Sequence, residues 1–262
     1  MKSFHVCTIV NDAGQYHSMC LSFAQSGFSE LNTRFTVFDN IGANRYEPYS
    51  ALNDIRRQTQ EPYLIFCHQD VRLDQGDGHD QLIVALTNLE KKDPKWAVAG
   101  NAGFTWNCLP KVRISDPQHG QGCRVGCLPH KVVSLDENFL VIRIDADVGC
   151  SDGLSGFHLY ATDLCLNAAM SGRSAYVIDF LVSHLSSGNA TTNDFYECRE
   201  LLVRHWNRRV SIIFVMTPST KLFLSRYPLV QNGARIAQRL GLLKLMRKVI
   251  IRARNTLTAP RA

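Results

Sequence analysis

The chain has 262 residues, 45% of them hydrophobic, which suffices for one large α/β domain or two small ones. No run of about 18 uncharged apolar residues occurs, so the sequence predicts no transmembrane helix. The formal net charge is +6, yet the segment from Gly233 onward holds eight basic residues and no acid, which leaves the first 232 residues at −2. Because the basic character belongs to this last segment, we expect no nucleic-acid partner for the domain.

The first ten residues carry one lysine and pass directly into a strand-like pattern. They lack the charged, apolar and small-residue order of a signal peptide, which predicts a cytoplasmic protein. Nine cysteines, an odd number, are spread along the chain, an arrangement that disfavours a disulfide framework. Cys123, Cys127 and His130 could suggest zinc, but no second pair of ligands follows at a useful spacing.

Strand and helix patterns alternate through the first hundred residues. Strands are predicted at 4–11, 34–39, 63–67 and 96–100, and helices at 16–26, 49–59 and 79–91. The third helix is the clearest, since Leu82, Leu86 and Leu89 recur at helical spacing. Repeated βα units of this kind predict a parallel, doubly wound sheet.

The pattern changes in the second half of the chain. Residues 104–130 are rich in Gly, Pro and Cys without a clear period, which predicts a long loop or an excursion. Further elements are predicted as one or two strands within 131–145, a helix ending at 170, a strand at 174–183 and a helix at 194–207. We therefore predict a single α/β domain over residues 1–215 and a basic amphipathic helical extension over residues 216–262.

The apolar strand at 63–67 ends abruptly in His68, Gln69 and Asp70. In open α/β sheets, ligands bind beyond the carboxyl ends of such strands. A carboxylate at that edge can hold a divalent cation against a diphosphate. The alternative is that Asp70 merely caps a turn.

Other polar residues stand at predicted ends of elements. Asn11-Asp12 and Asp39-Asn40 follow the first two strands, Asp163 lies near a helix start, and His184 follows the last strand. Each by itself is more often a cap or a turn residue. Their common position at the ends of elements favours one assembled site.

Five segments together resemble the GT-A glycosyltransferases of the large inverting family two, and specifically its short bacterial branch. They are residues 38–40 (FDN), 49–53 (YSALN), 64–71 (LIFCHQDV), 156–166 (GFHLYATDLCL) and 179–184 (DFLVSH). The resemblance runs from about Phe4 to about Gly188. It implies a GT-A fold, with a Rossmann-like, mostly parallel central sheet flanked by helices. It also implies an enzyme that transfers a sugar from a nucleotide-diphosphate sugar to a hydroxyl acceptor, with inversion.

The resemblance also implies a metal site and a donor site. Asp70 would be the chief ligand of Mn²⁺ or Mg²⁺ on the donor diphosphate, and His184 would complete the coordination. His68, which stands where relatives carry an acid, is a further candidate ligand. The residues implied for donor binding are Asn11, Asp12, Asp39, Asn53, Gln69 and Asp70.

Inversion requires a general base that removes the proton of the acceptor hydroxyl. Asp163 matches the family's candidate, with His158 as a possible substitute. Many relatives carry a further acid two residues earlier, where this chain has Ala161. Asp136 and Glu137 are predicted to lie in a solvated loop.

Two other functions remain open at this level. A metal-dependent nucleotidyltransferase also binds nucleotide and metal on an α/β sheet, although residues 11–15 are a poor version of its glycine-rich basic loop. The second is a non-catalytic nucleotide-sugar-binding domain. It stays open because Ala161 stands where many relatives carry a further acid.

The family resemblance suggests a role in assembling cell-surface polysaccharide or lipopolysaccharide, with a carbohydrate or lipid-linked acceptor. The stretch at 235–253 mixes basic and apolar residues at helical spacing, so it could lie on the anionic inner face of a membrane. Alternatively, it is a helix packed on the domain with a solvated basic face.

Overall fold

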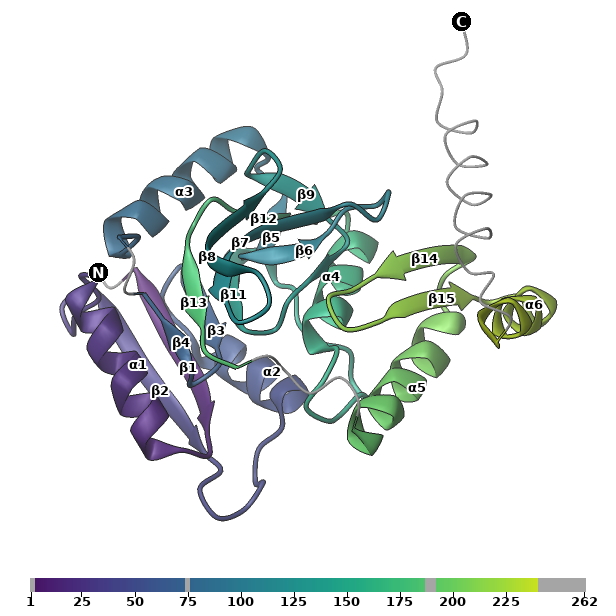
Figure 1. Ribbon diagram of the computed structural model, residues 1–262, viewed down its shortest axis with the longest axis horizontal. Coiled ribbons are helices and arrows are strands. Elements are labelled where there is room, and N and C mark those ends of the chain that lie inside the picture. Colours follow the sequence, from purple (N-terminus) through teal and green to yellow (C-terminus); the bar gives the residue numbers. More distant parts are fainter. Residues whose placement is uncertain (1–2, 74–75, 187–191, 240–262) are drawn as a thin grey trace, which may run out of the picture.

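The computed structural model describes residues 3–73, 76–186 and 192–239. A seven-stranded sheet forms its centre, with helices on both faces (Figure 1). In spatial order the strands are β2 (Thr33–Asp39), β1 (Phe4–Val10), β3 (Tyr63–Cys67), β11 (Phe139–Arg143), β5 (Trp96–Gly100), β12 (Ser174–Val177) and β9 (His130–Val132).

The two faces of this sheet are covered by different helices. One face packs against α1 (Ala13–Gln25) and α3 (His79–Lys92), and the other against α2 (Pro48–Gln58), α4 (Tyr160–Met170) and α5 (Asn193–Asn207). Side chains alternate across a strand, so β3 sends Leu64 and Phe66 to the second face and Ile65 and Cys67 to the first. This explains why the strand is apolar throughout.

The architecture confirms the predicted α/β fold class. The directions of the strands show how the central sheet is built. The pairs β1–β2, β1–β3 and β5–β12 are parallel. β11 is antiparallel to both of its neighbours, and β9 is antiparallel to β12, so the sheet is mixed. The sequence does not reveal this, because all five residues of β11 are buried and an apolar run carries no direction.

A second sheet crosses the carboxyl end of the first. Its strands are β10 (Ser134–Leu135), β6 (Ala102–Phe104), β7 (Pro110–Asp116), β13 (Val182–His184) and β4 (Val71–Arg72), with β8 (Gly120–Val125) paired to β7; a 3₁₀ turn, η1 (Ile144–Ala146), follows β11. Of the two alternatives for 104–130, a long loop and an excursion, the structure shows an excursion, because the segment contains the β7–β8 hairpin. No residue of β8 is buried, which removes the apolar alternation that marks a strand.

The prediction of one continuous strand at 174–183 is wrong. It divides into β12 in the central sheet and β13 in the second sheet. Residues 178–181 join them, and Leu181 N–H donates to Asp77 Oδ2 at 2.5 Å. The chain therefore passes from the central sheet to the second sheet, where His184 at the end of β13 pairs with β4.

Capping side chains fix the beginnings of two helices near this edge. Asp12 Oδ1 accepts hydrogen bonds from the backbone N–H groups of Gly14 and Gln15 at the start of α1. Glu47 does the same for α2, where Pro48 occupies the first turn, and its carboxylate also accepts from Gly156 N–H.

The chain continues into a hairpin, β14 (Ile212–Met216) and β15 (Lys221–Ser225), and then α6 (Pro228–Arg239). The predicted boundary after residue 215 falls inside β14, and Val215 and Leu224 are buried in the main core. The hairpin therefore belongs to the domain, and a helical extension can begin only after it. Residues 240–262, most of the predicted basic stretch, lie outside the described residues. No helix in the described ranges is both long and apolar enough to cross a bilayer.

We expect Leu224→Ala to lower the free energy of unfolding by about 2–5 kcal/mol, because it opens a cavity in the core. The matched control is Leu229→Ala in α6, where the side chain is 87% exposed, and it should change the value by less than about 0.5 kcal/mol. Denaturant unfolding of the full chain measures both. Equal effects of the two substitutions would show that the hairpin is not part of the domain core.

Candidate functional site

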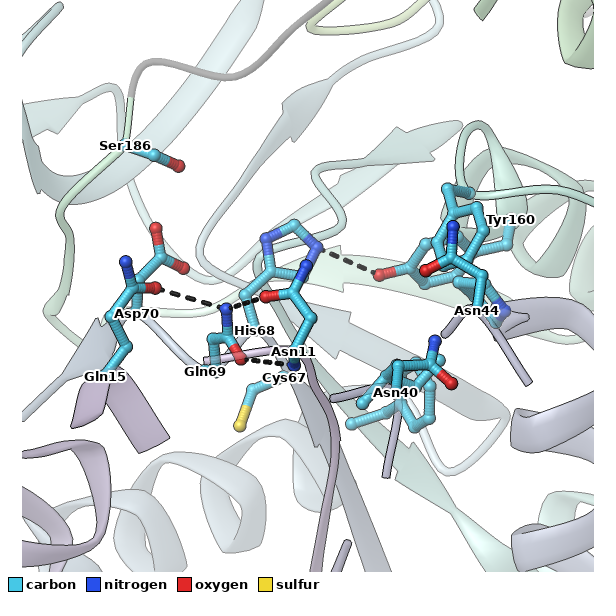
Figure 2. Close-up of a pocket in the computed structure, with 14 residues that line it drawn as sticks. Asn11, Gln15, Asn40, Asn44, Cys67, His68, Gln69, Asp70, Tyr160 and Ser186 are labelled. Carbon is cyan, nitrogen blue, oxygen red and sulfur yellow. Dashed lines mark hydrogen bonds between the residues drawn. The ribbon is translucent and has the colours of Figure 1, made fainter. Parts of the chain in front are cut away.

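A cavity of about 520 Å³ opens beyond the carboxyl ends of β1, β2 and β3 (Figure 2). It is formed by loops from several elements, because parallel strands bring their carboxyl ends to one edge. Its polar lining consists of Asn11 after β1, Asn40 and Asn44 after β2, residues 68–70 after β3, Tyr160 at the start of α4 and Ser186 after β13.

The structure brings His68, Asp70 and His184 together, although 114 residues separate the last two in sequence. The chain turns after β3 into β4, and β4 pairs antiparallel with β13 so that His184 faces Val71. His184 Nε2 lies 3.3 Å from Asp70 Oδ1 and 3.4 Å from His68 Nδ1. One donor atom from each of the three side chains lies within 4.8 Å of the others.

Tyr160 orients the ring of His68. The tyrosine hydroxyl donates to the backbone carbonyl of Glu137 at 2.9 Å, and His68 Nε2 lies 3.2 Å from the same hydroxyl. Since the hydroxyl has only one proton, His68 Nε2–H is the donor in the second contact. This leaves the Nδ1 lone pair facing His184 and Asp70. A partner that fixes the tautomer in this way is typical of histidines that bind metals.

The charges of the cluster suit a cation. Burial, reinforced by the charge of His184, lowers the pKa of His68 to about 4. Burial raises the pKa of Asp70, but the hydrogen bond and charge of His184 outweigh it and hold that pKa well below the usual range. Burial lowers the pKa of His184, whereas its hydrogen bond to Asp70 raises it, and the net direction is upward. Two imidazoles and one carboxylate form a donor set that fits a transition-metal ion such as Mn²⁺.

Unlike His68 and Asp70, Gln69 is hydrogen-bonded to the turn between β1 and α1. Its Oε1 accepts hydrogen bonds from the backbone N–H groups of Asn11 and Asp12, at 2.9 and 3.0 Å. Its Nε2 donates to Asn11 Oδ1 and to Gln15 Oε1. Gln69 therefore joins the end of β3 to the β1–α1 turn and shapes the cavity wall (Figure 2).

Three predicted donor-binding residues lie outside the lining of this cavity. Asp12 caps α1, and the exposed Asp39 accepts from Ile41 N–H; for both, donor contact stays a prediction. Asn53 is buried, and its amide bonds the backbone N–H and carbonyl of Cys150. These bonds hold the loop before α4, and donor contact by Asn53 stays a prediction.

The prediction of Asp163 as the general base conflicts with its surroundings. The side chain is fully buried and accepts hydrogen bonds from Ser151 N–H, Ser151 Oγ, Trp206 Nε1 and Asn167 Nδ2 at 2.6–3.2 Å. It lines neither this cavity nor the second one described below. Burial raises its pKa, opposed by the bonds from Ser151 and Trp206. Asp163 therefore ties α4 to α5 and to the preceding loop.

Sequence reasoning missed several lining residues and misplaced others. Tyr160 and Asn40 were inside the quoted segments but carried no assigned role. Asp136 and Glu137, predicted in a solvated loop, line a second cavity of about 370 Å³ beside His68 and His184. Their position follows from the pairing of β10 with β6, which no local pattern indicated.

A sequence comparison identifies a relative. The chain is 36% identical over 210 residues to the ATP synthase subunits region ORF 6 of Fuscovulum blasticum, which covers 78% of this chain and 84% of that protein. The chain belongs to the family of this protein. The name of the relative records a genetic region and no activity. No protein-family model matches the chain.

The family's fold is shown by solved structures. S. aureus TarS 1–349, in complex with UDP-GlcNAc, has a TM-score of 0.52 at 12% identity over 80% of this chain and 67% of TarS. GalNAc-T7, with UDP, GalNAc and Mn²⁺, has a TM-score of 0.51 at 11% identity over 80% of this chain and half (50%) of that one. Both are GT-A glycosyltransferases, so the family member described here has the GT-A fold, as its sequence predicted. Membership of the family-two branch stays a prediction.

We expect Asp163→Asn to destabilise the protein by roughly 1–3 kcal/mol, because the new NH₂ group would face N–H and O–H donors in a buried network. Nucleotide affinity should not change. The control is Asp54→Asn, which removes only an exposed ion pair with Arg57 and should cost less than about 1 kcal/mol. Chemical denaturation measures both variants. Unchanged stability of Asp163→Asn, together with lost turnover, would restore this residue as the base.

Proposed function

We propose that the protein is a metal-dependent inverting glycosyltransferase that transfers a sugar from a nucleotide-diphosphate sugar to a hydroxyl acceptor. The observation that carries the proposal is the cluster of His68, Asp70 and His184 at the wall of a large cavity in a GT-A fold. The fold alone would not be enough, because one fold hosts many activities.

The lining of the cavity supports the use of a cation. Within the described ranges, no lysine or arginine contributes to it, so no side chain there offers a permanent positive charge to a diphosphate. His68, Asp70 and His184 would hold Mn²⁺ or Mg²⁺, which would supply the charge that stabilises the leaving diphosphate. The oriented Nδ1 of His68 and the ionised Asp70 are the features of this chain that favour such binding.

Other residues of the cavity lining suit a nucleoside. Asn11, Asn40 and Asn44 offer amide groups, and Ile9 and Phe66 offer apolar surface. Asn40 is itself fixed, since its Oδ1 accepts from the backbone of residues 45 and 46. TarS and GalNAc-T7 are both described with uridine nucleotides, so uridine diphosphate is the first donor nucleotide to test.

The rival nucleotidyltransferase function is less compatible with this geometry. Such an enzyme needs free N–H groups in the turn after β1 to hold phosphates. Here Asp12 already accepts from the N–H groups of Gly14 and Gln15, and Gln69 accepts from those of Asn11 and Asp12. The backbone donors of the turn are thus occupied by side chains of the chain itself.

The proposed setting is cell-surface polysaccharide or lipopolysaccharide assembly, with a carbohydrate or lipid-linked acceptor, at the cytoplasmic face of a membrane. Its support is the eight basic residues after Gly233 and the exposed side chains of Leu229 and Ile236 in α6. Apolar and basic groups together favour attachment to an anionic bilayer surface.

We predict that one of UDP, GDP, CDP or dTDP stabilises the protein in the presence of Mn²⁺, and that Asp70→Ala abolishes the effect. At a hundredfold excess over the dissociation constant, a ligand that binds only the native state adds about 2.7 kcal/mol. Thermal unfolding with each nucleotide, with and without metal, provides the measurement. No stabilisation of the folded wild-type protein by any nucleotide would reject the donor site.

The donor set further predicts a preference for Mn²⁺ over Mg²⁺, because Mn²⁺, as a transition-metal ion, accepts imidazole ligands more readily than Mg²⁺, which demands oxygen ligands. His68→Asp replaces one imidazole by a carboxylate and should reduce this preference, whereas Asp54→Asn should not. Calorimetric titration of each metal with the stabilising nucleotide present measures the ratio. Equal ratios in wild type and His68→Asp would remove His68 from the metal site.

A further inference from the structure

A second cavity adjoins the proposed donor cavity and shares the residues His68, Phe157 and Ser186 with it. Its volume is about 370 Å³, and it lies between β6, β7, the loop before β11 and the start of α4. The titratable groups that line it include Asp116, His119, Asp136, Glu137 and His158. A group that enters this cavity would lie against the same wall that holds the metal-binding side chains.

The transfer proposed above needs a proton acceptor, and the buried Asp163 cannot reach an acceptor hydroxyl. We propose that Asp136 is the general base and that the second cavity takes a neutral, hydroxyl-bearing acceptor. This inference rests on the proposed glycosyl transfer. Asp136 lies in the loop between β10 and β11, which contacts the start of α4 through Glu137.

The geometry distinguishes Asp136 from the other carboxylates of the cavity. Both oxygens of Asp116 lie within 3.0 Å of His119 Nδ1, and Oδ1 also accepts from His119 N–H, so this carboxylate already has hydrogen-bond partners. The carboxylate of Glu137 accepts from backbone N–H groups at the start of α4, residues 159–161, and thereby caps that helix.

Asp136 itself is held in place by its own loop. Its backbone N–H donates to Ala102 O at 2.8 Å, and its Oδ1 accepts from Asn138 N–H at 3.1 Å. Asp136 lines the second cavity together with His68 and His184, so its carboxylate borders the same space as these metal-binding side chains. His68 also lines the proposed donor cavity.

His158 also lines the cavity, but its ring packs edge-on against Phe195, with centroids 5.4 Å apart. Burial lowers its pKa, so it is a neutral ring that could accept a proton. The packing against α5 favours a role in positioning the loop before α4. The test below separates His158 from Asp136.

The step balances in atoms and charge. The acceptor oxygen attacks the anomeric carbon from the face opposite the diphosphate, and a carbon–oxygen bond forms there. The bond from that carbon to the diphosphate oxygen breaks, and its electron pair leaves with the nucleoside diphosphate. The proton of the acceptor hydroxyl passes to a carboxylate oxygen of Asp136 and then to solvent.

The charge of the cavity determines which acceptors fit. Asp116, Asp136 and Glu137 line it, and none of its described lining residues is a lysine or an arginine. Burial raises the pKa of Glu137 to about 8, so this group is largely protonated at neutral pH. A phosphate or carboxylate group on the acceptor would still meet the carboxylate of Asp136 with no permanent cation beside it, which is unfavourable. Phe104 and Phe157 provide apolar surface for the face of a sugar ring. A neutral sugar unit is therefore the group expected to enter.

The test uses the full chain with Mn²⁺ and the nucleotide-sugar whose nucleotide gives the largest thermal stabilisation. The acceptor probes are methyl glycosides of neutral hexoses and the matching hexose 6-phosphates. Nucleoside diphosphate release and product mass are measured for wild type, Asp136→Asn, Glu137→Gln, His158→Gln and the surface control Asp54→Asn. Binding of the nucleotide is titrated separately for every variant.

We expect Asp136→Asn to lower turnover by roughly 10²- to 10⁴-fold. Its nucleotide affinity and melting temperature should stay at the wild-type values, because Asn can still accept from Asn138 N–H. Asp54→Asn should keep wild-type turnover. Neutral glycosides should be used in preference to the 6-phosphates.

Several results would overturn the inference. Wild-type turnover in Asp136→Asn, or a comparable loss only in Glu137→Gln or His158→Gln, would transfer the role of base to another group. Preference for the 6-phosphates would reject the neutral acceptor. If wild type binds nucleotide but turns over no donor, the protein is a binding domain, and both proposals fail. If it binds no nucleotide, the proposed function fails first.

Discussion

The short antiparallel pairing of β4 with β13 is the constraint on which the site depends. It consists of two residue pairs, yet it holds the turn after β3 against the segment that follows β12. Because His184 faces Val71 in this register, its imidazole comes within 3.3 Å of Asp70. The segments that follow β3, β5 and β12 along the chain join in the second sheet as β4, β6 and β13, so the pairing helps to hold this sheet at the carboxyl edge of the first. Cavity, metal-binding cluster and second cavity all arise at this edge.

Two carboxylates, Asp163 and Glu137, stabilise the start of α4. Asp163 joins the helix to Trp206 of α5, and Glu137 accepts from the backbone at residues 159–161. Both groups are expensive to bury, and their hydrogen bonds offset part of that cost. A proton acceptor for chemistry must instead keep access to the cavity, which directs attention to Asp136 in the loop before β11.

The two cavities share one electrostatic character. In the part of the chain that is described, neither has a lysine or arginine in its lining, whereas carboxylates occur in both. An anionic diphosphate is compatible with such surroundings only alongside a cation, and His68, Asp70 and His184 provide the donor atoms. The comparisons establish the fold, and this combination of charge and geometry is the support for the activity.

The sequence by itself determined the βα alternation, because β1, β3 and β5 are apolar runs and α3 has a clear helical period. It also marked the residues after β3, since polar groups rarely interrupt a buried strand without cause. Tertiary structure decided what local pattern cannot encode. The direction of β11 follows from its neighbours, and the solvent-facing β8 has no apolar alternation. Whether Asp163 faces the core or the cavity depends on α4 packing against α5, and the approach of His184 to Asp70 depends on the register of β4 with β13.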